Sequence, residues 1–168
     1  LLRKPGRSIE MILYHGSNVE IETIDLTKSK VGKDFGCGFY LSAEQEQAED
    51  MARFKVDIQG GEICVTSFDF DDSCLNSGEL NVKTFDDYSE EWASFVLSNR
   101  KNSTRQQIHP YDVVFGPIAD DKVGAQIRRL ENGDIDMKEF MNRIRYMRGI
   151  TFQYFFGTEQ SLKYLRHL

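Results

Sequence analysis

The sequence predicts a single domain of the α+β class. A chain of 168 residues fits one ordinary domain and leaves little room for two. Its content of 40% hydrophobic and 12% aromatic residues is enough to build a core. Short apolar runs lead and close the chain, and the helical segments between them do not alternate regularly with strands of the parallel type. This order favours α+β over a doubly wound sheet.

Five short apolar runs have the length and the residue types of β-strands. They occupy residues 12–15, 38–41, 63–70, 113–115 and 150–156. In the second run, strand alternation places Tyr40 and Ser42 on one face, and Phe39 and Leu41 on the other.

Helical periodicity predicts five helices. The first covers residues 43–54, which are rich in Glu, Gln and Ala, and aromatic residues at helical spacing predict the second over 85–96. A third is expected over 120–130. The fourth opens with a capping box, Asp136 and Glu139. The last follows Thr158 as its N-cap and is expected to pack Leu162 and Leu165.

Charge and hydropathy argue against a nucleic-acid coat protein and against a membrane-spanning protein. Acidic residues outnumber basic ones by 27 to 21, so the net charge is −6, which argues against a general nucleic-acid coat. No apolar run approaches the roughly 20 residues of a membrane span, so we expect no membrane association. Residues 1–10 are basic but lack the apolar core of a signal peptide. We expect them to be a linker or upstream segment, with the domain spanning 11–168.

The cysteine and histidine content indicates neither a disulfide framework nor a metal site. Cys37, Cys64 and Cys74 are odd in number and widely spaced, and no Cys-x-x-Cys occurs. The three histidines are too scattered to complete a metal cluster. We therefore expect a reducing, cytoplasmic setting and no bound metal, with His109 and His167 at the surface.

The first of three unusual segments is Leu13-Tyr14-His15-Gly16-Ser17. A histidine that ends an apolar strand before a glycine can point into a cleft, and the glycine lets a ligand approach the backbone closely. The alternative is a half-buried histidine that bonds its own turn.

The second segment runs over residues 34–42, Asp-Phe-Gly-Cys-Gly-Phe-Tyr-Leu-Ser. Glycines beside an aromatic strand leave a surface on which a planar ring could stack, although a packed sheet with a bulge explains them too. In the third segment, Gln153 interrupts an aromatic strand. Burying its amide without a partner would cost on the order of 1–3 kcal/mol, so it must bond a ligand or face the surface.

Together and in this order, the three segments resemble the His-Tyr-Glu signature of the ADP-ribosyltransferases, in the branch of diphtheria toxin and the poly-ADP-ribose polymerases. Residues 12–165 are also similar to a bacterial domain-of-unknown-function group assigned to that superfamily. Tyr-His-Gly-Ser, Asp-Phe-Gly-x-Gly-Phe-Tyr-Leu-Ser/Thr and a late glutamine strand recur in that group. The resemblance implies small antiparallel sheets split around an NAD cleft and surrounded by helices.

The resemblance also implies roles for individual residues. The catalytic set is His15, Tyr40 and Gln153: His15 would bond ribose hydroxyls, Tyr40 would stack on the nicotinamide ring, and Gln153 takes the place of the family's acid. The Gly16 backbone would hold the nicotinamide carboxamide. The implied NAD-binding set is His15, Gly16, Ser17, Gly38, Tyr40 and Ser42.

Gln153 departs from the family pattern, because an amide brings no full negative charge to a developing cation. Three interpretations stay open at this point. The chain uses Gln153 itself, borrows a carboxylate such as Glu159 or Asp34, or binds NAD without turning it over. Thr151 stands where arginine-directed transferases carry Glu or Gln, which argues against an arginine acceptor.

The sequence as a whole therefore predicts an NAD-dependent ADP-ribosyltransferase that cleaves the nicotinamide glycosidic bond. NAD is expected as its substrate and an unknown protein or nucleic acid as its acceptor. The resemblance suggests a toxin-like bacterial module held by an inhibitory partner protein. The alternatives are a non-catalytic module that binds NAD or ADP-ribose, and an NAD glycohydrolase.

Overall fold

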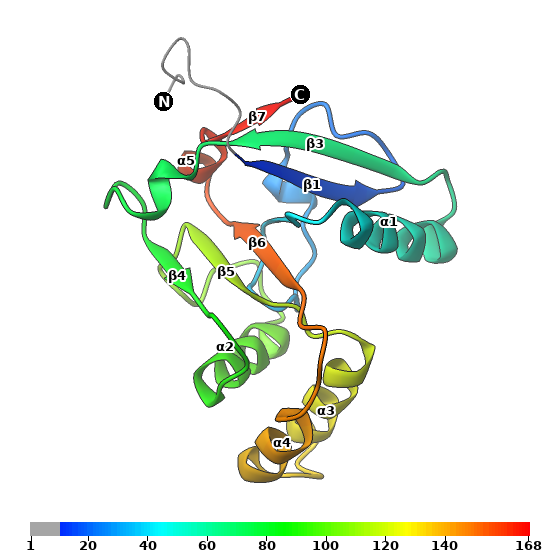
Figure 1. Ribbon diagram of the computed structural model, residues 1–168, viewed down its shortest axis with the longest axis vertical. Helices are drawn as coiled ribbons and strands as arrows, with labels where there is room; N and C mark the ends of the chain where they lie inside the picture. The colour runs from blue at the N-terminus through cyan, green and yellow to red at the C-terminus, as the bar shows by residue number, and fades with distance from the viewer. Residues whose placement is uncertain (1–10) are drawn as a thin grey trace.

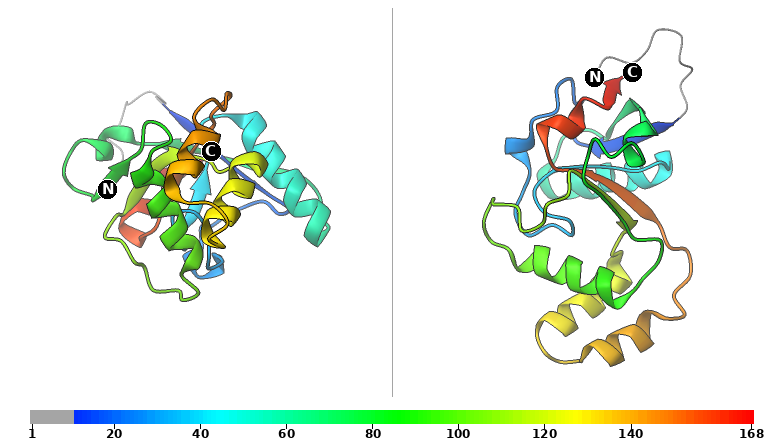
Figure 2. Two further views of the ribbon diagram at one scale, coloured as in Figure 1. Left: turned by 90° about the horizontal axis from the view of Figure 1, so that it is seen from below. Right: turned by 90° about the vertical axis from the view of Figure 1, so that its left-hand side faces the viewer.

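The computed structural model describes residues 11–168, and the expected linker at residues 1–10 lies outside the described residues. Two β-sheets lie one above the other, with α1 beside the upper sheet and α2, α3 and α4 below the lower one (Figure 1). The right panel of Figure 2, a view from the side, shows the same grouping of α2, α3 and α4 at the lower end of the molecule.

The upper sheet is antiparallel throughout. Its order is β1 (Ile12–Ser17), β3 (Cys64–Phe70) and β7 (Leu165–His167). In the register of the first pair, His15 lies opposite Thr66 and Gly16 opposite Val65.

The lower sheet is mostly antiparallel and is built around β6. Its order is β2 (Phe39–Leu41), β6 (Phe152–Phe156), β5 (Val113–Pro117) and β4 (Val82–Thr84). The pairs β2–β6 and β6–β5 are antiparallel, and β5–β4 is parallel. One backbone bridge, between Tyr14 and Ser42, connects β1 to the chain just after β2.

Within residues 11–168 the chain forms five α-helices, and side-chain caps begin four of them. They are α1 (Gln45–Gln59), α2 (Glu90–Lys101), α3 (Asp121–Glu131), α4 (Met137–Ile144) and α5 (Glu159–Leu162). Ser89, Asp120, Asp136 and Thr158 each accept a backbone N–H bond from the first turn of α2, α3, α4 and α5 respectively. Two short 3₁₀ helices are η1 (Leu26–Lys28) and η2 (Asp72–Leu75).

Strand alternation gives the domain two cores on opposite faces of β6. Tyr154 and Phe156 belong to a cluster that includes Leu13 of β1 and Phe68 of β3. Phe155 points the other way, into a cluster shared with α2, α3 and α4. Gln153 lies on the Phe155 face, because side chains two residues apart in a strand share a face.

The α+β class with two mostly antiparallel sheets is confirmed, and each predicted strand is present within two residues of its expected bounds. Three details of the prediction were wrong. The edge strands β4 and β7 were not expected. The aromatic helix begins only at Glu90, so Phe85 and Tyr88 precede it. Leu165 lies in β7 rather than in the last helix, which ends at Leu162.

None of the helices in the described part of the chain has the length and apolar character needed to cross a membrane.

Candidate functional site

His15 of β1 is held against the backbone of β2. Its Nδ1 lies 2.7 Å from the carbonyl oxygen of Tyr40, and its ring stacks on Phe39 with centroids 4.2 Å apart. Because a carbonyl oxygen can only accept, Nδ1 carries the proton. Burial lowers the pKa of His15 to about 4, so the ring is neutral at pH 7 and Nε2 is left as a hydrogen-bond acceptor.

The backbone N–H and C=O groups of Gly16 point to the edge of β1 that faces away from β3. Tyr14 and Ser42 exchange both backbone hydrogen bonds, at 2.7 and 2.8 Å, so the polar backbone groups of Tyr14 point to that edge. Those of Gly16, two residues on, point to the same edge. A Cβ at Gly16 would lie 1.8 Å from the carbonyl oxygen of Ala48, so the glycine also lets α1 pack closely on β1.

The Tyr40 side chain is fixed by its own motif. Its hydroxyl donates to the carbonyl of Gly36 at 2.6 Å and accepts the N–H of Phe35 at 3.0 Å. Its ring packs on Phe155, with centroids 5.2 Å apart. Burial, assisted by the negative charge of Asp34, raises the pKa of the Tyr40 hydroxyl well above its usual range. The hydroxyl is therefore neutral, and its two hydrogen bonds hold the side chain in place.

Gln153 lies next to Tyr40 on the same face of the lower sheet. Phe155 is the register partner of Tyr40, and Gln153 precedes it by two residues, which makes Tyr40 and Gln153 diagonal neighbours. Within residues 11–168, the Nε2 of Gln153 is buried and has no hydrogen-bond partner. Leaving a buried amide unpaired costs about 1–3 kcal/mol, so this nitrogen is a donor that lacks a partner among the described residues.

The predicted serines have partners within the protein. Ser42 is buried, and its hydroxyl accepts the backbone N–H of Glu44 at 3.0 Å. Ser17 is buried as well, with its Oγ 3.5 Å from the Nζ of Lys55 on α1. Both lie near the Tyr14–Ser42 bridge, and their NAD-binding roles stay predictions.

Gly38 is required by packing. A Cβ there would lie 2.2 Å from the Phe155 ring, and its N–H donates to Ser29 Oγ at 2.8 Å. The ligand role predicted for Gly38 stays a prediction.

Neither Asp34 nor Glu159, the two carboxylates considered as substitutes for the family's acid, is placed as an unpaired group beside Gln153. Asp34 is bound by Arg100 at the C-terminal end of α2, with Oδ1 and Nε 2.7 Å apart. Glu159 is exposed in the first turn of α5, which follows the end of β6 opposite to Gln153. Among the predicted residues, His15 thus contacts the backbone of Tyr40, and Gln153 is the diagonal neighbour of Tyr40. The His15 ring stacks on Phe39 and so lies on the other face of β2 from the Tyr40 side chain.

A protein-family model matches residues 11–167 and carries the description Protein of unknown function (DUF3990). The chain belongs to this family. This confirms the expected membership in a domain-of-unknown-function group. No curated protein and no solved structure matches the chain.

His109 of this DUF3990 domain is half-buried among aromatic residues rather than exposed, so the expectation of a surface residue was wrong in part. Its Nε2 lies 2.7 Å from the carbonyl oxygen of Phe35, and its ring packs between Phe95 and Tyr111. Burial lowers the pKa of His109. No local sequence pattern predicts this hydrogen bond, because the carbonyl partner lies 74 residues away along the chain.

Two lysines near His15 were missed as well. Lys33 Nζ lies 5.2 Å from the centre of the Tyr40 ring, and Lys55 reaches Ser17. Lys55 follows Ala48 and Ala52 at helical spacing, on the face of α1 that packs against β1. The spacing alone does not predict that Lys55 lies near His15, because this depends on the packing of α1 against β1.

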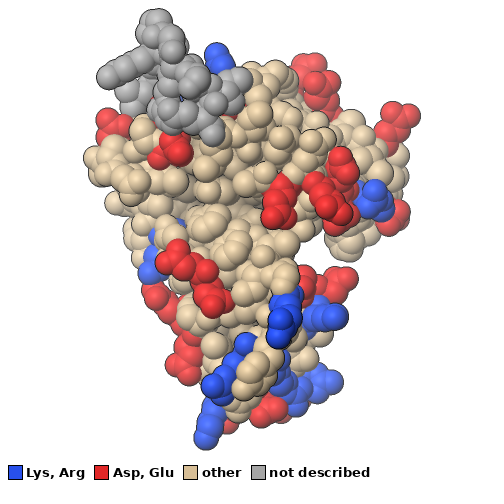
Figure 3. Space-filling view, in the orientation of Figure 1, with Lys and Arg blue, Asp and Glu red and all other residues tan. Residues whose placement is uncertain are grey.

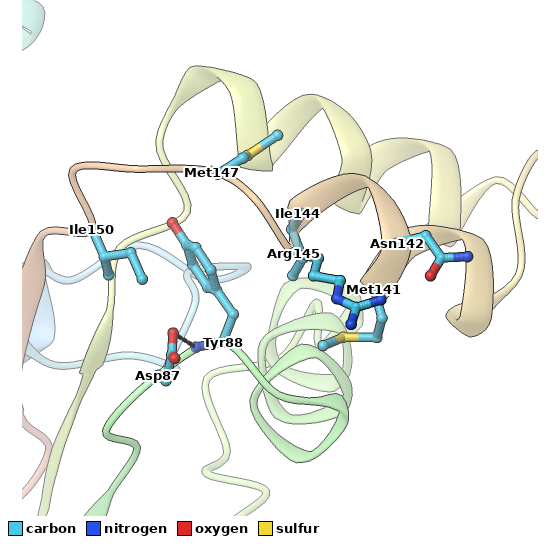
Figure 4. A pocket seen from close by; sticks show the side chains of 8 residues that line it. All are labelled: Asp87, Tyr88, Met141, Asn142, Ile144, Arg145, Met147 and Ile150. Carbon is cyan, nitrogen blue, oxygen red and sulfur yellow. Dashed lines mark hydrogen bonds between the residues drawn. The ribbon is translucent and has the colours of Figure 1, made fainter.

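Two cavities of the DUF3990 domain lie away from these residues. The larger, of about 490 Å³, lies between α4 and the residues before α2, and Tyr88 points across it toward Ile150 and Met147 (Figure 4). Its lining residues are Asp87, Tyr88, Met141, Asn142, Ile144, Arg145, Met147 and Ile150. The smaller, of about 290 Å³, includes His109 and Phe95. In Figure 3 the surface is also notched on the right, between the lobe of α1 and that of α3 and α4.

Proposed function

We propose that the chain is an NAD-dependent ADP-ribosyltransferase. In this reaction the bond between C1′ of the ribose and the nicotinamide nitrogen breaks, and its electron pair stays on nicotinamide. The ribosyl cation is attacked by the acceptor, which loses a proton. The products are nicotinamide, the ADP-ribosylated acceptor and a proton. The acceptor is a protein or nucleic acid, or water in the glycohydrolase alternative.

The observation that carries the proposal is the hydrogen bond that joins His15 of β1 to the Tyr40 carbonyl of β2, with Gly16 following His15 in the chain. A neutral histidine with a free Nε2 can accept a hydrogen bond from a ribose hydroxyl. A carboxamide has both a donor and an acceptor, and the N–H and C=O of Gly16 on one strand edge complement it. The fixed ring of Tyr40 offers a face for a planar heterocycle.

Gln153 supports the same proposal and limits its rate. Its unpartnered Nε2 can donate to a ribose oxygen beside Tyr40. An amide dipole stabilises a developing cation less than a carboxylate does. We therefore expect slow turnover. The same amide favours the second candidate, a module that binds NAD or ADP-ribose without cleaving it.

The two mostly antiparallel sheets, joined by the Tyr14–Ser42 bridge, support the expected transferase-like arrangement. An inhibitory partner protein and a toxin-like role belong to the proposal as its biological setting. They depend on the resemblance alone.

The test is the release of nicotinamide from NAD, followed by chromatography. We expect release by the wild type and its loss in His15→Phe, which keeps the ring stacked on Phe39 but removes both nitrogens. Tyr40→Leu should also lose activity, whereas Tyr40→Phe retains the stacking surface and part of the rate. The matched control for His15→Phe is His167→Phe, at an exposed position on β7.

Calorimetry with NAD on the same samples separates the candidates. Binding that His15→Phe weakens, without nicotinamide release, would indicate the non-catalytic module. Neither binding nor release would overturn both.

A further inference from the structure

Lys33 and Lys55 approach the strands that carry Tyr40 and His15 from two separate segments, and the charge of Lys30 acts on both of them. Lys30 and Lys33 belong to the loop between η1 and β2, and Lys55 belongs to α1. Lys33 lies over the Tyr40 ring at 5.2 Å, and Lys55 lies 3.5 Å from Ser17 Oγ on the strand that carries His15. Lys33 and Lys55 are partly buried, and Lys30 is exposed.

These ammonium groups are close enough to repel one another. The pKa of Lys33 is lowered by burial and by the charges of Lys55 and Lys30, although Asp34 partly offsets this effect. The pKa of Lys55 is lowered by burial and by Lys30. Both lysines also lower the pKa of His15.

The repulsion is poorly compensated from within the protein. Asp34, the carboxylate that raises the pKa of Lys33, is itself paired with Arg100 at 2.7 Å. A local excess of positive charge in a chain of net charge −6 indicates a place for an anion.

We propose that Lys30, Lys33 and Lys55 form a binding site for a diphosphate group, next to His15 and Tyr40. Ammonium groups are compact donors that bind phosphate oxygens through charge-assisted hydrogen bonds. The diphosphate is that of a dinucleotide, in which case the inference rests on the proposed function, or it is a free inorganic diphosphate.

The position of Lys33 gives the site a further property. Its ammonium group covers the Tyr40 ring. The nicotinamide ring of NAD also carries a positive charge, so the two compete for the same ring face. A diphosphate bound by the three lysines would compete with the Tyr40 ring for the ammonium group of Lys33. Nicotinamide alone is therefore expected to bind poorly, whereas ligands with a diphosphate bind.

The experiment is calorimetry with inorganic diphosphate and with ADP-ribose at low ionic strength. The variants are Lys33→Gln, Lys55→Gln and the double variant. Lys138→Gln, at an exposed position on α4, removes the same charge elsewhere. Each cluster substitution should weaken both ligands about tenfold, because a charge-assisted bond contributes about that factor. Lys138→Gln should leave both affinities unchanged.

Thermal unfolding of the same variants checks that they fold. Removing one of several repelling charges should leave the melting temperature unchanged or raise it. Weaker binding by an equally stable variant supports the anion site.

Several results would overturn the anion site. They are absence of diphosphate binding by the wild type, wild-type affinity in the double variant, or an equal loss in Lys138→Gln. If diphosphate binding needs the lysines but the protein neither binds NAD nor releases nicotinamide, the anion site is upheld and the transferase is refuted. If the double variant releases nicotinamide with an unchanged KM for NAD, the transferase is upheld and the anion site is refuted.

Discussion

Lowering the pH from 7 to 4 is expected to destabilise the fold through His15. The pKa of this histidine is about 4 in the folded protein, against 6.5 for an unperturbed histidine. Between these two values the unfolded chain binds more protons than the native one. The contribution of His15 to the free energy of unfolding is therefore fully present above pH 6.5, and it is lost as the pH decreases toward 4.

The gap between 6.5 and about 4 corresponds to about 3 kcal/mol of unfolding free energy, at about 1.4 kcal/mol per pH unit. This is a large share of the stability of an ordinary domain. Its cause is the burial of an imidazole whose Nδ1 already donates to Tyr40, near the positive charges of Lys33 and Lys55.

Urea unfolding at a series of pH values between 4 and 7 measures this effect. His15→Phe keeps the stacking on Phe39 but removes the titrating group. We expect it to be less stable than the wild type at pH 7, because it leaves the Tyr40 carbonyl without its donor. The difference should shrink by about 3 kcal/mol toward pH 4. His167→Phe should follow the wild-type curve. Parallel curves for wild type and His15→Phe would refute the reasoning.

Three further sites give sharp expectations. Gly16→Ala places a methyl group 1.8 Å from the Ala48 carbonyl and should lower the unfolding free energy by on the order of 3 kcal/mol in urea. Gln153→Leu removes a buried unpaired donor and should raise stability by about 1 kcal/mol while weakening NAD binding in calorimetry. Gln153→Glu should increase nicotinamide release about tenfold, and an unchanged rate in an active enzyme would show that the amide is not limiting. A double-mutant cycle of Asp34→Asn and Arg100→Gln should give a coupling energy of about 1–2 kcal/mol, and additivity would mean that the pair contributes nothing.

The elements that could be predicted are those with a local pattern. Strand alternation correctly placed the side chains of Tyr40 and Phe39 on opposite faces of the strand. The predicted caps at Asp136 and Thr158 begin two of the helices. The three motif segments were recognisable because a histidine before a glycine or a glutamine among aromatic residues is unusual in a short stretch.

The elements that were missed depend on long-range contacts. The strands β4 and β7 have three residues each and lie at sheet edges, where partial exposure leaves no clear alternation. The spacing of Leu162 and Leu165 fits a helix, but pairing with β3 extends the chain at Leu165. The lysine cluster has no sequence signature, since Lys33 and Lys55 come together only through the packing of α1 on β1.

The glutamine at position 153 and the lysines near Tyr40 have one common explanation under the proposed function. Asp34 is already held by Arg100, so the lysines depend on a ligand for their counter-charge. A carboxylate at position 153, next to Tyr40, would attract Lys33 and compete with a diphosphate for it. The neutral amide leaves the ammonium groups to the ligand, at the expense of weaker stabilisation of the ribosyl cation. Binding strength and bond cleavage thus place opposite demands on this residue, and Gln153 favours binding.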